Sequence, residues 1–266
     1  MLIPMLMLLT SGNTYKIHKS APMENVKKVV VEVDNADVSI QKNNSMHLDA
    51  DLVQHRCGEN ILNKYTFEVE KEKDIMYISV KKKDMDFELH KCSLELVLEL
   101  PHVNVLKVNS LAGDISVKDF RSDSIEVRTR AGDVYMDNFK TDNLIVKVLA
   151  GDIRIEGSAI ANNVSLETTS GDVYVKKHPE LKKLEIETKS GNIDIEGNLL
   201  KKEDKILAEA SSGDIKCLVK NIDKGVKISA STKSGNIESS VPIIVGDDED
   251  CNVIFKARGG DIIISY

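Results

Sequence analysis

A short motif, Gly-Asp or Gly-Asn followed by Ile or Val, recurs eight times in the last two thirds of the chain. Successive glycines are 19 to 25 residues apart. A repeat of this length is typical of a solenoid, in which each unit buries its apolar edge only against its neighbours. The eight pairs are Gly113-Asp114, Gly132-Asp133, Gly151-Asp152, Gly171-Asp172, Gly191-Asn192, Gly213-Asp214, Gly235-Asn236 and Gly260-Asp261.

Each glycine separates two stretches of alternating residues. In the fifth copy, Leu184 and Ile186 stand seven and five residues before Gly191, and each is followed by a polar residue. Alternation with period two predicts a β-strand with one buried face. The apolar positions resume two residues after the glycine, at Ile193, so the alternation changes phase there. Gly tolerates positive φ, and Asp or Asn hydrogen-bonds nearby backbone in turns, so the motif predicts a corner between two strands.

Equivalent strands of successive repeats must run in the same direction, which makes the sheets parallel and the connections right-handed. We therefore predict an all-β fold: a single-stranded parallel β-helix, or β-solenoid, of about nine coils with an N-terminal antiparallel β cap. The first coil is degenerate, with Ala36 in the glycine position.

The repeat pattern divides the chain into three segments. Residues 1–20 form a leader or disordered segment, residues 21–101 an N-terminal β region with one degenerate coil and hairpin strands, and residues 102–266 the Gly-Asp repeat solenoid. The chain ends on the apolar run 262–266, which we expect to be an open sheet edge. Such an edge offers a route to self-association.

Charge and length exclude some partners. A net charge of −7 argues against nucleic acid as the main partner. No apolar run is long enough for a transmembrane segment. The run 1–9 is apolar but contains no Lys or Arg, so a cytoplasmic or other intracellular location is favoured and secretion is the alternative.

The four cysteines have neither metal-binding nor redox spacing. Cys217 occupies an inward position, which predicts a buried free thiol, and a Cys57–Cys92 bridge is an open alternative. No cofactor motif is present, because the Gly-Asp corners are followed by neither a helix nor a Lys-Ser/Thr pair. We predict no cofactor.

The column of Asp and Asn residues beside the glycines is a candidate calcium site, because some solenoids bind calcium between coils. Those repeats use several glycines per copy, whereas this chain has one, and Asn192 and Asn236 remove charge from the column. We predict instead that the column caps backbone amides at the corners, and we predict no metal.

An outward acidic column, Glu167, Glu187 and Glu209, is the second candidate site. Paired carboxylates on a β-helix face can perform acid/base chemistry on polysaccharides. Basic residues such as Lys189 and Lys233 lie one column over, which favours a solvated face of mixed charge.

A third column contains Tyr135, Arg154 and Tyr174, which would stack as a cation–π ladder on neighbouring strands. It continues with Asp194, Lys216 and Glu238, which alternate in sign and suit cross-strand pairing. The column either supports the register or offers a flat surface for sugar or protein contact. The acidic run 246–250 is expected to be a solvated loop.

The stretch 94–101, Leu-Glu-Leu-Val-Leu-Glu-Leu-Pro, followed by Gly113-Asp114-Ile115 and its later copies, resembles the adhesin-like β-strand-repeat family. These are domains of unknown function related to the head domains called GIN. The resemblance implies a parallel β-helix without catalytic residues.

We therefore predict a non-enzymatic scaffold or binding module for a protein or glycan. The alternatives are a carbohydrate-active β-helix that uses the Glu column, and a structural protein that assembles through its C-terminal edge.

Overall fold

The computed structural model describes residues 14–55, 60–83, 92–177, 181–197 and 199–266. The chain divides into two compact units, residues 1–132 and 133–266. Among the described residues the one helix is the 3-10 turn η1 (Leu62–Lys64), and all other regular elements are strands. The predicted all-β class is therefore confirmed.

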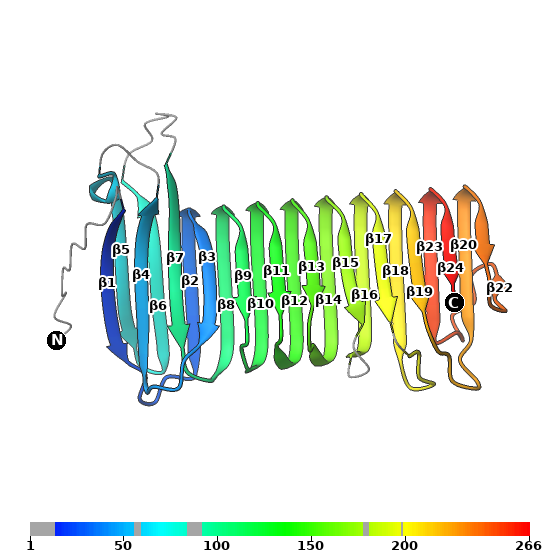
Figure 1. Ribbon diagram of the computed structural model, residues 1–266, viewed down its shortest axis with the longest axis horizontal. Helices are drawn as coiled ribbons and strands as arrows, with labels where there is room; N and C mark the ends of the chain where they lie inside the picture. Colours follow the sequence, from blue (N-terminus) through cyan, green and yellow to red (C-terminus); the bar gives the residue numbers. More distant parts are fainter. Residues whose placement is uncertain (1–13, 56–59, 84–91, 178–180, 198) are drawn as a thin grey trace. The chain divides into compact units, whose positions relative to one another are not determined.

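Each repeat of the second unit places one strand in each of two sheets (Figure 1). The strand before the Gly-Asx corner lies in sheet B and the strand after it lies in sheet A, and neighbouring strands pair in parallel. In spatial order, sheet B of this unit consists of β22 (Ile244–Val245), β20 (Ile228–Ser234), β23 (Val253–Gly259), β18 (Lys205–Ser212), β16 (Leu181–Ser190), β14 (Ile160–Ser170) and β12 (Lys140–Ala150). Sheet A consists of β11 (Val134–Asp137), β13 (Ile153–Glu156), β15 (Val173–Lys177), β17 (Ile193–Gly197), β19 (Ile215–Val219), β24 (Ile262–Ser265) and β21 (Ile237–Ser239).

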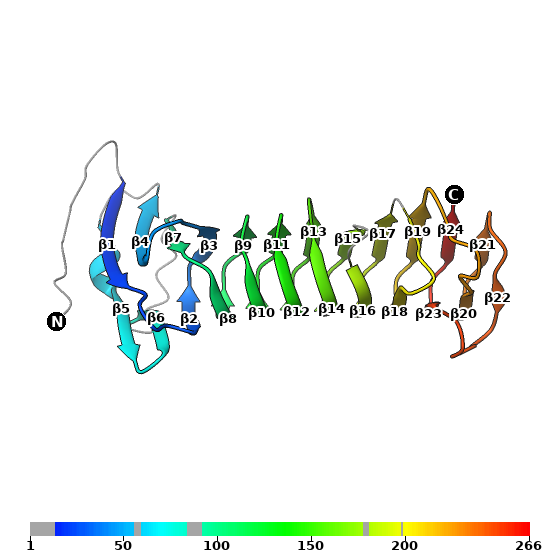
Figure 2. The same ribbon diagram turned by 90° about the horizontal axis from the view of Figure 1, so that it is seen from below.

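The core of the second unit lies between its two sheets, which form separate layers in Figure 2. The inward residues of each repeat are almost fully buried, as Leu184 and Ile186 are in β16 and Ile193 in β17. Burial of β-branched and aliphatic side chains on one face of each strand is the main driving force for this stacking.

The corners require glycine for two reasons. Gly171 and Gly191 have φ values of +153° and +151°. A Cβ atom on either residue would lie 2.0 Å from the carbonyl oxygen of the preceding repeat's glycine. The carbonyl oxygen of Gly151 also accepts a hydrogen bond of 3.1 Å from the buried Thr168 hydroxyl. A side chain at the corner would therefore force adjacent backbones apart.

The Asp and Asn residues beside the glycines form a ladder of hydrogen bonds along the second unit. The backbone N–H of each donates to the side-chain Oδ1 of the Asp or Asn one repeat away, as Asn192 does to Asp172 at 2.7 Å. The same bond recurs through the stack in the order 152 to 133, 172 to 152, 192 to 172, 214 to 192, 261 to 214 and 236 to 261. Asn192 accepts from Asp214 through its amide oxygen at 2.9 Å, so the ladder needs an acceptor and not a charge.

This geometry predicts different outcomes for two substitutions of one residue. Asp172→Ala should lower the free energy of unfolding by about 1 kcal/mol, because the Asn192 N–H loses its acceptor. Asp172→Asn should be nearly neutral, since its amide oxygen can accept the same bond. Urea denaturation of the two variants measures the difference. Equal losses in both would show that the charge, and not the hydrogen bond, stabilises the corner.

The last repeat in the sequence is not the last repeat in the stack. Strand β23 pairs with β18 on one side and β20 on the other, and β24 lies between β19 and β21. The prediction that residues 262–266 form an open edge for self-association is therefore wrong. The edges at this end of the unit are β22 in sheet B and β21 in sheet A.

The first unit combines parallel and antiparallel pairing. In sheet A of this unit the order is β1 (Tyr15–Pro22), β4 (His47–His55), β7 (Ser93–Leu100), β3 (Asp37–Lys42) and β9 (Ile115–Lys118). In sheet B it is β10 (Ser122–Ala131), β8 (Val103–Ala112), β2 (Lys28–Asn35), β6 (Ile75–Lys82) and β5 (Tyr65–Glu72). Strands β2 and β3 flank Ala36 and pair in parallel with β8 and β9. The pairs β1–β4, β4–β7 and β5–β6 are antiparallel.

Strand β1 corrects part of the predicted N-terminal segment. Residues 15–20 belong to this strand, so the leader or disordered segment predicted for residues 1–20 is wrong over that part. Two side chains of β1 contact Asp51 of β4, with Lys16 Nζ 2.6 Å and His18 Nδ1 2.7 Å from its carboxylate oxygens. These contacts and the antiparallel ladder hold β1 on the sheet. The apolar run 1–9 lies outside the described residues, and the predicted boundary at residues 101 and 102 stays a prediction.

Candidate binding site

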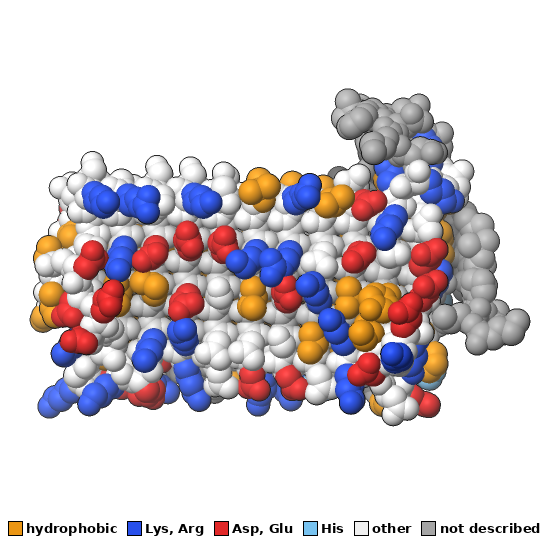
Figure 3. Space-filling model, turned by 180° about the vertical axis from the view of Figure 1, so that it is seen from behind, with side chains coloured by type: hydrophobic (Ala, Val, Ile, Leu, Met, Phe, Trp, Pro, Cys, Tyr) orange, Lys and Arg blue, Asp and Glu red, His pale blue; other side chains and the backbone are white. Residues whose placement is uncertain are grey.

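The acidic column predicted from the sequence lies on the outer face of sheet B in the second unit. Glu167, Glu187 and Glu209 occupy directly opposed positions on β14, β16 and β18. A lysine adjoins each end of this acidic row: Lys147 pairs with Glu167, and Lys256 Nζ lies 3.9 Å from Glu209 Oε1. Figure 3 views this face and shows acidic side chains in a row, with basic side chains in a second row beside it.

The middle member of the acidic row has no partner. Among the described residues, the Glu187 carboxylate makes neither a hydrogen bond nor an ion pair, and the side chain is exposed. All three carboxylates are exposed or half-exposed on an open face. A general acid of a glycoside hydrolase needs a carboxyl group held in an apolar, water-poor pocket, and this row does not provide one.

A groove of about 460 Å³ lies at the end of the acidic row. Its floor is the outer face of β16, β18, β23 and β20, and Gly246 and Asp247 of the loop after β22 form one side. Asp247 accepts a hydrogen bond of 2.7 Å from the Ser231 hydroxyl and lies 3.8 Å from Lys256 Nζ. The predicted solvated loop 246–250 therefore has one carboxylate fixed over the sheet.

The predicted tyrosine–arginine column lies on the other sheet. Tyr135, Arg154 and Tyr174 occupy opposed positions on β11, β13 and β15 of sheet A. The Arg154 guanidinium lies 5.4 Å from the centroid of the Tyr174 ring, within cation–π range. The acidic column and the tyrosine–arginine column therefore lie on different sheets, because the chain turns a corner between them.

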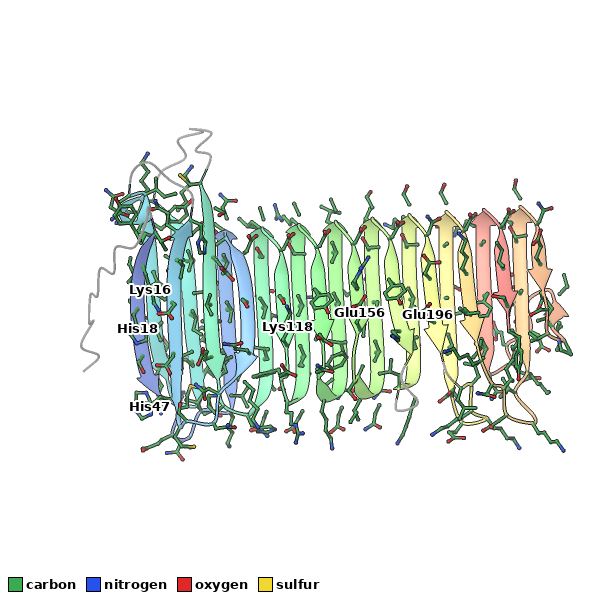
Figure 4. The ribbon with its side chains drawn as sticks, viewed as in Figure 1. Lys16, His18, His47, Lys118, Glu156 and Glu196 are labelled. Carbon is green, nitrogen blue, oxygen red and sulfur yellow. The ribbon has the colours of Figure 1, made fainter. Side chains whose placement is uncertain are left out.

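Two glutamates on sheet A, labelled in Figure 4, bind the tyrosine hydroxyls. Tyr174 donates to Glu196 Oε2 at 2.9 Å, and Tyr135 donates to Glu156 Oε2 at 3.4 Å. Arg154 also lies 3.7 Å from Glu156. The sequence reasoning missed both glutamates, which stand two residues beyond the tyrosine–arginine column. The groups of this column satisfy one another, which fits the predicted role in register support.

Burial, followed by the hydrogen bond and charge of Glu196, raises the pKa of Tyr174 to about 12. Because this value exceeds the ordinary value of 10.0, the folded state holds the proton more tightly than the unfolded state does. The resulting stability is fully present below pH 10 and is lost as pH rises towards 12.

This linkage predicts that Tyr174→Phe reduces the slope of stability against pH between pH 10 and pH 12. Glu196→Gln should reduce it less, because burial still raises the pKa of the tyrosine. Urea denaturation at several pH values gives the slopes. An unchanged slope in Tyr174→Phe would contradict the assignment.

The predicted alternation of positive and negative charge along the tyrosine–arginine column of sheet A is interrupted after Lys216. Asp194 opposes Lys216 as expected, but Ile263 of β24 lies between Lys216 and Glu238. The predicted neighbour relation of Lys216 and Glu238 is wrong because β24 is inserted between β19 and β21. A shallow pocket of about 360 Å³ lies here, lined in part by Tyr174, Asp194 and Lys216.

The cysteines take different states. Cys217 and Cys251 are buried and are not disulfide-bonded, as predicted for Cys217. Cys92 is disulfide-bonded, and Cys57, the partner considered for it as an alternative, lies outside the described residues. Burial is the main cause that raises the pKa of the Cys251 thiol, so we expect this cysteine to be a weak nucleophile.

Within the described ranges, no three His, Cys, Asp or Glu side chains come together in a metal-binding arrangement. In the same ranges, no helix has the length and apolar character needed to span a bilayer.

The sequence reasoning missed the cations that complete the groove. Lys256 and Arg258 of β23 lie opposite Glu209 and Ser211 of β18 because β23 is inserted next to β18. The sequence offered one signal of this insertion. The spacings between the last motif glycines are the longest, so these repeats contain enough residues to bypass a neighbouring repeat in the stack.

Several solved structures are similar to this chain over most of its length. A proposed adhesin from Bacteroides fragilis is 15% identical, with 94% of this chain and 97% of that chain covered and a TM-score of 0.57. A proposed lipid-binding protein from Parabacteroides distasonis is 13% identical, with 96% and 98% covered and a TM-score of 0.48. A proposed adhesin from Parabacteroides merdae is 12% identical, with 94% and 97% covered and a TM-score of 0.48.

No curated protein matches this sequence. A family model described as Toastrack DUF4097 matches residues 26–259, which is most of the chain. The relation to GIN head domains stays a prediction. On the strength of this match and of the stacked parallel strands, the chain belongs to the Toastrack DUF4097 family.

Proposed function

We propose that this protein is a non-enzymatic binding module that presents the outer face of sheet B in its second unit to a partner. One observation carries the proposal: charged side chains without partners border a groove of about 460 Å³ on this face. Glu187, Lys233 and Arg258 make no ion pair with any residue that the structure describes. A ligand that pairs with these groups gains interactions that the folded chain leaves unused.

The scaffold suits this role because the groove is built on paired strands. Strands β16, β18 and β23 each have a parallel neighbour on both sides, so the groups on their outer faces are held at fixed spacings. Rigid elements reduce the entropy lost on binding. The Bacteroides fragilis structure is described as a proposed adhesin, a role of the same class.

A glycan array combined with a polysaccharide-hydrolysis screen tests the proposal. We expect the full-length chain to retain glycans without releasing reducing ends. If the wild type hydrolysed a polysaccharide and Glu187→Gln did not, the protein would be a carbohydrate-active enzyme, and the proposal of a non-enzymatic binding module would be wrong. Glu196→Gln, on sheet A, is the matched control for a Glu substitution on the same unit.

A further inference from the structure

The groove on sheet B of the second unit contains two kinds of polar group at separate positions. Glu187, Glu209 and Asp247 supply carboxylates on one side. Arg258 and Lys233 supply cations one column over, on β23 and β20. A ligand in the groove therefore faces hydrogen-bond acceptors along one edge and positive charge along the other.

The two cations lie side by side. The flanking pairs Thr232–Ala257 and Ser234–Gly259 fix the register of β20 against β23, so Lys233 and Arg258 are neighbours across the two strands. Both side chains are exposed. An arginine next to a lysine forms a binding site for one carboxylate, because the guanidinium makes two parallel hydrogen bonds and the ammonium adds a point charge.

The opposite edge is arranged to accept hydrogen bonds. Lys256 Nζ lies between two carboxylates, 3.9 Å from Glu209 and 3.8 Å from Asp247. Asp247 is held in place by the Ser231 hydroxyl. Carboxylate oxygens are strong acceptors for hydroxyl groups.

The lining disfavours other ligand classes. Among the described lining residues none has a large apolar side chain, and Ala210 and Ala257 are buried towards the core, so the groove has no pocket for the large apolar or aromatic anchor of a peptide. A densely charged polyanion would meet Glu187 and Glu209, and a neutral sugar would leave both cations unpaired. A compact ligand with several hydroxyls and a single carboxylate satisfies both edges.

We propose that this groove binds a carboxylate-bearing sugar, of the uronic acid class, with its carboxylate against Arg258 and Lys233 and its hydroxyls against Glu187, Glu209 and Asp247. The inference rests on the proposed binding function and names its ligand class. The groove volume is within the range of small-molecule sites.

The test is an NMR-monitored titration of the full-length chain with D-glucuronate, its methyl ester and D-glucose. We expect glucuronate to bind with a Kd on the order of millimolar, as befits one sugar in an open groove. The ester and glucose should bind at least about tenfold more weakly, because one charge-assisted contact is worth about that factor. The perturbed amides should lie in β18, β20 and β23.

Matched variants locate the contact. Arg258→Gln should weaken glucuronate binding about tenfold or more, whereas Arg154→Gln, an exposed arginine on sheet A of the same unit, should leave it unchanged. Equal binding of ester and acid, or an unaffected Arg258→Gln variant, would overturn the ligand assignment.

The glycan array separates this assignment from the function it rests on. Glycans retained equally by the wild type and Arg258→Gln would leave a binding module but exclude this groove as the acidic-sugar site. Absence of glucuronate binding by the wild type would exclude the ligand class itself, while a protein partner on the same face would keep the binding function.

Discussion

Replacing Gly171 with alanine is expected to lower the free energy of unfolding by roughly 3–5 kcal/mol, near the upper end for a single substitution. The glycine has a φ of +153°, which costs an L-residue about 1–2 kcal/mol. The new Cβ would also lie 2.0 Å from the carbonyl oxygen of Gly151, and backbone atoms cannot move aside without breaking the ladder. Urea denaturation followed by circular dichroism measures the loss.

Gly246 provides the matched control. Its φ is +129°, but no atom beyond the glycine and its two chain neighbours lies within 4 Å of the position that a Cβ would take. Gly246→Ala should therefore cost only the conformational strain of about 1–2 kcal/mol. If both variants lost the same stability, the close approach of the stacked corners would not be the reason for glycine in this column.

Replacing Ile193 with aspartate should destabilise the second unit severely, by about 4 kcal/mol or more. Ile193 is fully buried in β17, and its strand neighbours Val173 and Ile215 are buried as well. An aspartate there would have to leave a carboxyl group among aliphatic side chains without a hydrogen-bond partner. The melting temperature by calorimetry is the direct measure.

Leu218→Asp is the corresponding control on the outer face of sheet A. Leu218 is 40% exposed, so the same aliphatic-to-acid change keeps its charge in water. The new carboxylate would oppose Glu196, which costs less than about 1 kcal/mol. A melting temperature of Ile193→Asp close to that of Leu218→Asp would refute the inward assignment of the column.

The strands and corners were predictable because each rests on local chemistry that recurs. The alternation around Gly191 identifies which side of each strand is buried, and the phase change locates the corner. The hydrogen bond from Asn192 to Asp172 follows from the same alignment, since equivalent residues of neighbouring repeats lie opposite one another. The predicted all-β class with mainly parallel strands is accordingly confirmed.

The order of the last repeats was not predictable from these patterns. Strands β20 and β23 both present apolar residues in the same columns, so Ile228 and Val253 fit equally well opposite Ile206 of β18. A repeat pattern determines which residues share a column but not which repeat occupies which place in the stack. The choice depends on the connections 220–227 and 246–252, whose sequences carry no repeat signal.

Part of the candidate site was predictable from the sequence, and part was not. The adjacency of Glu167, Glu187 and Glu209 follows from consecutive repeats, and the structure places them together. The positions of Lys256 beside Glu209 and of Arg258 in the same groove depend on the insertion of β23, which the sequence pattern left open. The contact of Asp247 with Ser231 depends on a loop conformation, which column alignment does not address.

The position of β23 between β18 and β20 decides whether the groove exists, and paired cysteines test it directly. Parallel neighbours have Cα atoms about 4.8 Å apart, within disulfide range, whereas residues two strands apart are about 10 Å apart, beyond it. Glu209→Cys with Lys256→Cys, and Ser231→Cys with Lys256→Cys, should each cross-link under mild oxidation, because both pairs are directly opposed. Glu209→Cys with Ser231→Cys should not. Peptide mass mapping identifies the linked pair. A disulfide between positions 209 and 231, without one between 209 and 256, would place the repeats in sequence order and contradict the groove.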